Sequence, residues 1–187
     1  MRVLVACEFS GTVRDAFAAR GHDAWSCDLL PSEKPGNHIQ GTILDHDIVS
    51  REWDLMIAHP DCTFLTVSAN RWACDEWRIE ARIAAMHFVR SLWAFPVRRI
   101  AIENPVGVLN TFWRRPDQTV QPYQFGDPFK KGTCLWLKGL PLLVPTNDLG
   151  DGEQACWKEP PSEDRWKIRS RTYRGIALAM AEQWGSS

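Results

Sequence analysis

The residues best suited to chemistry in this sequence are a cysteine and a glutamate that each follow a short apolar run. Cys62 comes after Asp54 to Ala58 through the turn His59-Pro60-Asp61, and Glu103 directly follows Arg99 to Ile102. A deprotonated thiol is a nucleophile, and a carboxyl group at the mouth of an apolar strand is partly desolvated, so we expect the pKa of Glu103 to rise. A protonated glutamate can donate a hydrogen bond to a ring nitrogen. The alternatives are a buried structural cysteine and a surface glutamate.

Two further segments have the character of a nucleoside-cofactor site. Phe9-Ser10-Gly11 follows the apolar run Arg2 to Ala6, and Asp28 follows the run Asp23 to Cys27. A glycine lets the backbone approach a ligand closely, and an acid after the second strand can accept hydrogen bonds from ribose hydroxyls. The G-x-G-x-x-G fingerprint of dinucleotide-binding proteins is absent, so a tight turn with a solvent-facing acid is the alternative.

Strands alternate with helices along the chain, which predicts an α/β fold with a mostly parallel sheet flanked by helices. Ligands bind such sheets beyond the carboxyl ends of the strands, so the four segments should converge on one edge. The helical spacing places Ile79, Ile83, Met86 and Trp93 on one face. Apolar patterns predict strands at 2–6, 23–27, 54–58, 99–102 and 133–137, and helices after Gly11, at 75–94 and over Ile176, Met180 and Trp184.

Length and composition favour one globular domain. The chain has 187 residues, 44% of them hydrophobic and 24% charged, and residues 138–165 form its least regular stretch, a long loop or small subdomain. Its apolar runs are too short to span a membrane, and Glu8 and Asp15 interrupt any signal peptide, so we expect a cytoplasmic protein. The six cysteines contain no C-x-x-C, which favours reduced thiols and no metal site.

The formal net charge of -1 argues against strong non-specific binding of duplex nucleic acid. The chain is nevertheless rich in tryptophan, with 10 residues, and tryptophan stacks on flat rings. Arg71-Trp72, Trp77-Arg78 and Trp113-Arg114-Arg115 combine an aromatic ring with a cation. Each is a candidate contact for bases and phosphates, and the alternative is a packed tryptophan beside a solvated arginine.

Read together, these segments resemble the cytosine-C5 DNA methyltransferase family. Phe9-Ser10-Gly11 is similar to the family's Phe-x-Gly cofactor motif, and Asp28 to the acid after its second strand. Pro60-Asp61-Cys62 is similar to its Pro-Pro-Cys nucleophile motif, and Glu103-Asn104-Pro105 to its Glu-Asn-Val motif. The order and strand-end placement match over residues 1–110.

This resemblance implies a Rossmann-like S-adenosylmethionine-dependent methyltransferase fold, with Cys62 attacking C6 of cytosine and Glu103 and Asn104 at the N3 edge. Lys130 and Lys131 stand where the family has an Arg-bearing motif, and 171–175 with the last helix stand for its C-terminal cofactor motif. The implied cofactor contacts are Phe9, Ser10, Gly11, Asp28 and Pro60, and the implied substrate contacts are Lys130, Lys131, Arg71 and Thr63.

The chain departs from the family pattern in four places. Asp61 replaces the second proline and should raise the thiol pKa, Thr63 stands where glutamine is usual, and Thr42 follows Gly41 where aspartate is usual. Residues 138–165 are too few for a target-recognition domain, as in the compact versions found on phages and prophages. The substrate stays open between duplex DNA, single-stranded DNA and a free cytosine nucleotide, and the oligomeric state stays open too. The alternative function is a catalytically degenerate cofactor- or nucleic-acid-binding module that regulates or decoys a modification system.

Overall fold

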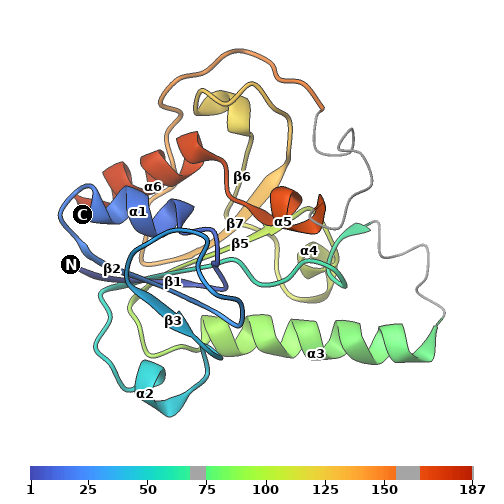
Figure 1. Cartoon of the computed structure of the whole chain (residues 1–187). Coiled ribbons are helices and arrows are strands. Elements are labelled where there is room, and N and C mark those ends of the chain that lie inside the picture. The colour runs from blue at the N-terminus through green and yellow to red at the C-terminus, as the bar shows by residue number, and fades with distance from the viewer. Residues whose placement is uncertain (68–74, 155–164, 187) are drawn as a thin grey trace.

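The computed structural model describes residues 1–67, 75–154 and 165–186, and a twisted β-sheet lies at its centre (Figure 1). Within these residues seven strands lie in the order β3-β2-β1-β4-β5-β7-β6. The first five in this order pair in parallel, whereas β7 is antiparallel to both β5 and β6. The strands are β1 (Arg2–Ala6), β2 (Asp23–Asp28), β3 (His38–Gln40), β4 (Leu55–Ala58), β5 (Arg99–Pro105), β6 (Gln118–Val120) and β7 (Thr133–Lys138). The prediction of an α/β fold with a mostly parallel sheet is confirmed, and the arrangement is compatible with a Rossmann-like fold.

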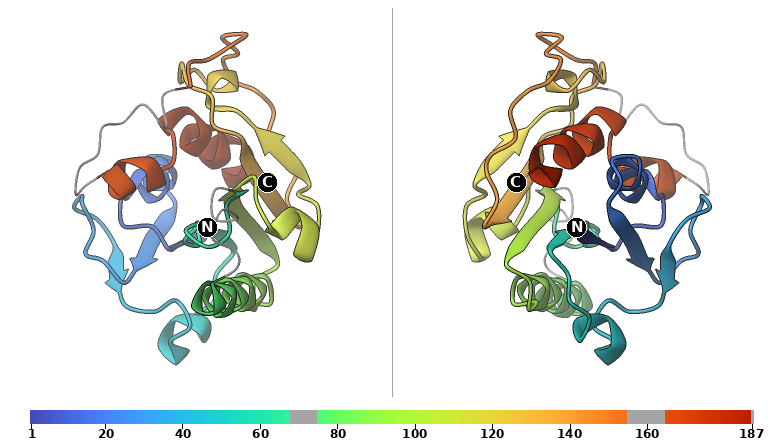
Figure 2. Two further views of the ribbon diagram at one scale, coloured as in Figure 1. Left: turned by 90° about the vertical axis from the view of Figure 1, so that its right-hand side faces the viewer. Right: turned by 90° about the vertical axis from the view of Figure 1, so that its left-hand side faces the viewer.

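Helices cover both faces of the sheet (Figures 1 and 2). α1 (Thr12–Ala18) and α6 (Arg174–Gly185) pack on one face, and the long α3 (Glu76–Trp93) packs on the other. The shorter helices are α2 (His46–Val49), α4 (Leu109–Phe112), α5 (Arg165–Ser170) and the 3-10 helix η2 (Pro122–Gln124). Among the described residues, no helix has the length and apolar character needed to cross a membrane.

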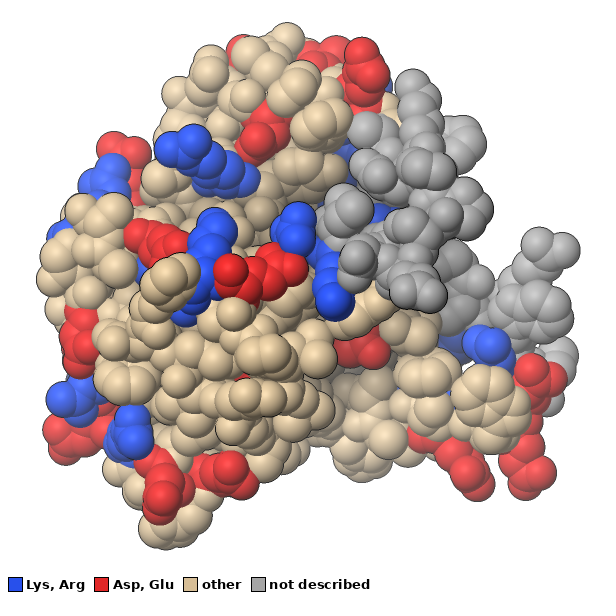
Figure 3. Space-filling model, in the orientation of Figure 1, with Lys and Arg blue, Asp and Glu red and all other residues tan. Residues whose placement is uncertain are grey.

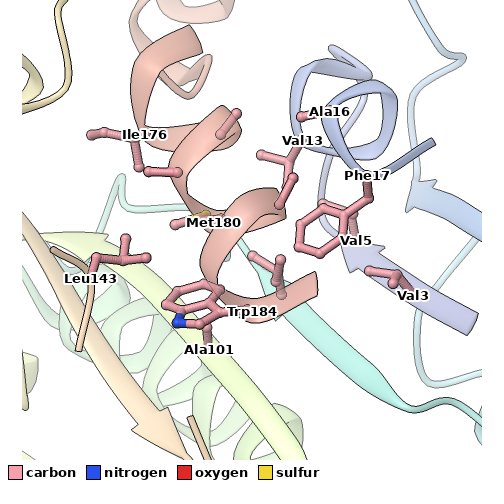
Figure 4. Packing of buried hydrophobic residues seen from close by; sticks show 14 of the residues in the cluster. Val3, Val5, Val13, Ala16, Phe17, Ala101, Leu143, Ile176, Met180 and Trp184 are labelled. Atoms are coloured by element: carbon pink, nitrogen blue, oxygen red, sulfur yellow. The ribbon is translucent and has the colours of Figure 1, made fainter. Parts of the chain in front are cut away.

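The α1/α6 layer is held by a core that the sequence spacing predicts. Ile176, Met180 and Trp184 lie four residues apart on α6, so they share one face and are almost completely buried. They pack with Val13 and Phe17 of α1 over the buried face of β1 (Figure 4). The predicted final helix and its apolar face are therefore confirmed.

The predicted apolar face of α3 is wrong in its first half. Ile79 and Ile83 are 45% and 50% exposed, and the buried residues of this helix are Val89 and Leu92. Figure 1 shows the reason, because the N-terminal half of α3 extends beyond the strands that the C-terminal half covers. The helix itself lies within the predicted range of 75–94.

The strand order has a switch point between β1 and β4. The chain runs from β1 outward to β2 and β3, then crosses back so that β4 pairs with the other side of β1. Connections on the two sides of this switch point diverge and leave a crevice beyond the carboxyl ends of the strands. The segments after β1 and β4, which begin at Cys7 and His59, border this crevice.

β5 is longer than the sequence predicts. Its parallel pairing with β4 stops at Ile102, where the apolar run ends, but the strand continues through Pro105 because β7 pairs with it on the other edge. Glu103 and Asn104 therefore lie on a strand that is held from one side. Beyond Lys138, the described residues 139–154 contain no helix and no named strand, as predicted for this irregular stretch.

Candidate active site

The turn that carries Cys62 is fixed at both ends by hydrogen bonds. The His59 amide donates to Ala6 O of β1, and the Leu65 and Thr66 amides donate to Cys62 O. Asp61 Oδ1 accepts hydrogen bonds from the Thr63 amide (2.9 Å) and the Thr63 hydroxyl (2.7 Å). These contacts form a side-chain-stabilised turn that holds the thiol beyond the end of β4.

The end of β5 is tied to this turn through two neighbouring residues. Asn104 is buried, and its Nδ2 donates to Pro60 O at 2.8 Å. Glu103 Oε2 lies 3.1 Å from His59 Nδ1, and only 7% of the His59 side chain and 13% of the Glu103 side chain are exposed. The hydroxyl of Thr172, just before α6, lies 3.4 Å from the same nitrogen. Three segments far apart in sequence thus meet at His59.

A cavity of about 380 Å³ opens beside these residues. Its volume is in the range of small-molecule sites. Among the predicted site residues, those that line this cavity are Cys62, Glu103, Asn104, Pro60, Thr63 and Lys131. The other lining residues are His59, Asp61, Thr66, Pro105, Trp166, Arg169 and Ser170.

Burial raises the pKa of the Cys62 thiol, and the nearby carboxylates of Asp61 and Glu103 raise it further. Lys131 acts in the opposite direction, since its positive charge favours the thiolate. The prediction that Asp61 raises the thiol pKa is therefore confirmed. The thiol is mostly protonated until substrate, solvent or a cation changes these surroundings.

The expectation that the pKa of Glu103 rises is wrong. Burial does act in that direction, but the hydrogen bond and the charge of His59, together with Lys131, outweigh it and lower the pKa. The reason is the imidazole at 3.1 Å, a partner that strand-by-strand reasoning from the sequence does not supply. Glu103 is thus an ionised carboxylate with a basic neighbour.

The two predicted substrate lysines have different surroundings. Lys131 lines the cavity, and its ammonium group donates to Arg169 O at 2.9 Å. Lys130 is absent from the lining, and its ammonium group forms an ion pair with the exposed Asp151. Lys131 therefore stands at the candidate site, whereas Lys130 braces the irregular stretch after β7.

The predicted cofactor residues after β1 lie outside this cavity lining, and their polar groups are used within the fold. The buried Glu8 carboxylate accepts hydrogen bonds from the Val13 and Arg14 amides (2.7 and 3.1 Å) at the start of α1. Ser10 Oγ lies 3.3 Å from Glu8 Oε1, and Gly11 has a left-handed φ of 68°. The carboxylate of Glu8 therefore occupies the backbone N–H groups at the start of α1.

Phe9 and Asp28 follow the neighbouring parallel strands β1 and β2, Phe9 three residues beyond β1 and Asp28 at the end of β2. The Phe9 ring lies 5.9 Å, centre to centre, from the Trp166 ring, which lines the cavity. Phe9 O accepts from the amide of Glu33, in the loop that follows Asp28. Asp28 is half-buried, its Oδ1 accepts from the Leu30 amide at 2.9 Å, and burial raises its pKa. Phe9 thus connects the end of β1 to the cavity wall.

Sequence reasoning missed the contribution of His59 and of 166–170, and it assigned Thr172 only to the segment 171–175 that the resemblance connects with the cofactor. His59 adjoins the quoted motif, so its place at a strand end was a usable signal, whereas Trp166, Arg169 and Thr172 reach the site only through tertiary packing. Arg71 lies outside the described residues. Trp113 packs against Trp93 and Trp136, which makes it a core residue rather than a stacking platform.

Across the described part of the chain, no three His, Cys, Asp or Glu side chains gather as a metal site would require. The chain matched no model of a known protein family and no curated protein. Any inference about the function of this chain therefore rests on the geometry of the site.

Proposed function

We propose that this chain is an S-adenosylmethionine-dependent methyltransferase that acts on C5 of cytosine, with Cys62 as nucleophile. The observation that carries the proposal is that a thiol, a carboxyl group and a buried amide, those of Cys62, Glu103 and Asn104, line one cavity. A reaction at a pyrimidine ring needs a nucleophile and a proton donor at different atoms of one ring, so both must share a pocket.

Each of these groups has a role that suits its surroundings. The Cys62 thiolate adds to C6, which makes C5 electron-rich, and Glu103, whose carboxylate is hydrogen-bonded to His59, faces the N3 edge where negative charge develops. Asn104 Oδ1 is buried without a hydrogen-bond partner among the described residues, so it can accept from an N–H of the base. Lys131 lowers the pKa of the thiol and so increases the fraction of thiolate.

Phe9 and Asp28 would hold the nucleoside part of the cofactor. Their fit to that group rests on the half-buried carboxyl of Asp28 at the end of β2 and on the aromatic ring of Phe9 beside the cavity wall. The amides at the start of α1 are already bound by Glu8, so the cofactor's own carboxylate needs other donors. When bound, S-adenosylmethionine supplies a methyl group that is electrophilic enough for an activated C5.

The substrate that suits this site is a cytosine presented singly, in single-stranded DNA or in a nucleotide, or flipped from a duplex. Lys131 and Arg169 provide cations at a cavity of small-molecule size. Figure 3 shows Lys and Arg side chains interspersed with Asp and Glu, instead of the continuous basic surface that duplex binding uses. Contacts to one nucleotide therefore matter more here than contacts along a duplex.

A second candidate function is a non-catalytic binding module. The observation that favours it is the thiol itself, whose pKa is raised by burial, Asp61 and Glu103 together. A protonated thiol is a weak nucleophile, and a site with such a thiol can still bind a base.

Calorimetry and a methyl-transfer screen separate the two functions. We expect binding of S-adenosylmethionine and transfer of its labelled methyl group to C5 of cytosine, tested on duplex DNA, single-stranded DNA, RNA and dCMP. No cofactor binding at about millimolar concentration would contradict the enzyme proposal. Cofactor binding without transfer to any of the four substrates would favour the binding module.

A further inference from the structure

The surroundings of His59 are those of a residue that binds a ligand or transfers a proton, and differ from those of a purely structural residue. Its side chain is 7% exposed, its Nδ1 faces Glu103 Oε2 at 3.1 Å, and its Nε2 is buried without a partner among the described residues. Buried polar atoms in folded proteins nearly always have partners, so such an atom in a cavity lining points to a ligand or to proton transfer.

The hydrogen bond between the two side chains has a defined direction. The pKa of Glu103 is lowered by His59, so the carboxylate is ionised and can only accept. Nδ1 therefore carries the hydrogen and donates it to Oε2. Thr172 Oγ1, at 3.4 Å, supports the same nitrogen from the segment before α6.

Four other ionisable groups line the cavity around this pair in the described residues. Asp61 and Cys62 come from the turn of His59 itself, Lys131 from the segment before β7, and Arg169 from α5. Asp61 is formally negative, Lys131 and Arg169 are formally positive, and Cys62 is a thiol. These groups neither cancel the charges of His59 and Glu103 nor replace either residue. The second imidazole nitrogen, Nε2, is buried without a hydrogen-bond partner among the described residues.

We propose that His59 is a positioning residue that holds, next to Glu103, the proton needed at N3 of the base. The inference rests on the proposed function and names the source of the proton that the proposed reaction needs at N3. A lone ionised Glu103 has no proton to give, whereas a pair that shares one proton does.

The proton and electron pairs balance in this step. As Cys62 Sγ forms its bond to C6, the π electrons of C5–C6 move to C4–C5 and those of C4–N3 move to N3. Glu103 delivers a proton to N3 and takes the Nδ1 proton of His59, which leaves the imidazole neutral. C5 next forms a bond to an electrophile, which is the cofactor's methyl group or, in heavy water without cofactor, a deuteron. Loss of the original C5 hydrogen to solvent as a proton then re-forms the C5–C6 double bond and expels the Cys62 thiolate, and N3 returns its proton through Glu103 to His59.

His59→Gln tests this relay, because its amide can still donate to Glu103 but cannot carry an extra proton. The assay is exchange of the C5 hydrogen of dCMP and of a cytosine oligonucleotide in heavy water without cofactor, followed against pH. Without the shared proton, the variant depends on protonation of Glu103 alone. We expect a loss of about tenfold or more near pH 8 that shrinks as the pH falls toward the range in which Glu103 itself takes up a proton. His87→Gln, an exposed histidine on α3, is the matched control and should exchange like the wild type.

A second measurement follows the carboxyl group directly by ¹³C NMR of labelled glutamate, with Glu103→Gln to assign the signal. Removal of the imidazole should move the Glu103 titration to higher pH, the opposite direction from the change in the exchange profile. An equal loss of exchange at every pH, or an unmoved carboxyl titration, would overturn the relay and leave the proposed function standing. A wild-type protein without exchange or methyl transfer on any substrate would instead overturn the proposed function.

Discussion

The two halves of the sheet edge differ in what their polar side chains do. In the cavity half, formed by 59–63 and 103–105, His59 Nε2 and Asn104 Oδ1 are buried without partners among the described residues. In the brace half, formed by 8–14 and 28–36, polar groups bind one another: Glu8 binds the start of α1, and the Arg14 side chain is buried by its bonds to the loop after β2. Free buried polar atoms are available to a ligand, whereas satisfied ones stabilise the fold. The cavity half therefore suits the proposed chemistry, whereas the contacts of the brace half suit a stabilising role.

Among substitutions that distinguish the cavity half from the brace half, Cys62→Ser should have the largest effect on activity. A serine hydroxyl is a far weaker nucleophile than a thiolate, so methyl transfer should fall by at least about a thousandfold. The residue lines the cavity and only exchanges sulfur for oxygen, so the unfolding free energy should change by less than about 1 kcal/mol. Labelled methyl transfer, chemical unfolding and cofactor calorimetry measure the three quantities. Unchanged turnover in this variant would remove the C5 mechanism altogether.

Arg14→Met should show the opposite pattern. The Arg14 side chain is 1% exposed, and its guanidinium donates to Ser26 Oγ (3.2 Å), Ser32 Oγ (3.0 Å) and Pro35 O (3.0 Å). The change removes the bonds that tie α1 to the loop after β2 and the ion pair of Arg14 with Asp15, so we expect the free energy of unfolding to fall by about 3 kcal/mol. Urea denaturation measures this change.

The control for this prediction is Arg20→Met in the turn that follows the same helix. Arg20 pairs with Glu182 at 3.4 Å, but both side chains are about half-exposed, so the change should cost no more than about 0.5 kcal/mol. In folded Arg14→Met protein, the alkylation rate of Cys62 should equal that of the wild type. A stable Arg14→Met protein with an altered thiol would reverse the assignment of the two halves.

The same contrast explains what the sequence could predict. The strand β4 and the start of β5 are apolar runs whose burial is decided locally, and motif residues that follow these two strands line one cavity. Arg14 could not be predicted as buried, because the loop that covers it returns from beyond β2. The direction of the Glu103 pKa failed for the same reason, since the imidazole that decides it comes from a neighbouring strand end.

The smallest expected effect belongs to Asp61→Asn. Asp61 Oδ1 accepts from the Thr63 amide and hydroxyl, and an asparagine Oδ1 can accept both bonds, so the turn should persist while its negative charge disappears. That charge raises the pKa of Cys62, so its removal should lower the thiol pKa and shift the alkylation profile toward lower pH. Mass spectrometry of the Cys62 peptide after timed exposure to iodoacetamide measures the rate at each pH.

Asp151→Asn is the matched control for Asp61→Asn, because Asp151 is an exposed acid that pairs with Lys130 and does not line the cavity. It should leave the alkylation profile of Cys62 unchanged. If Asp61→Asn also leaves the profile unchanged but weakens binding of dCMP, the carboxylate acts on the amino group of the base rather than on the thiol. In that outcome Asp61 selects the substrate, and the raised pKa of Cys62 comes from its burial and from Glu103. A shifted profile with unchanged dCMP affinity would show that the carboxylate that replaces the second proline acts on the nucleophile itself.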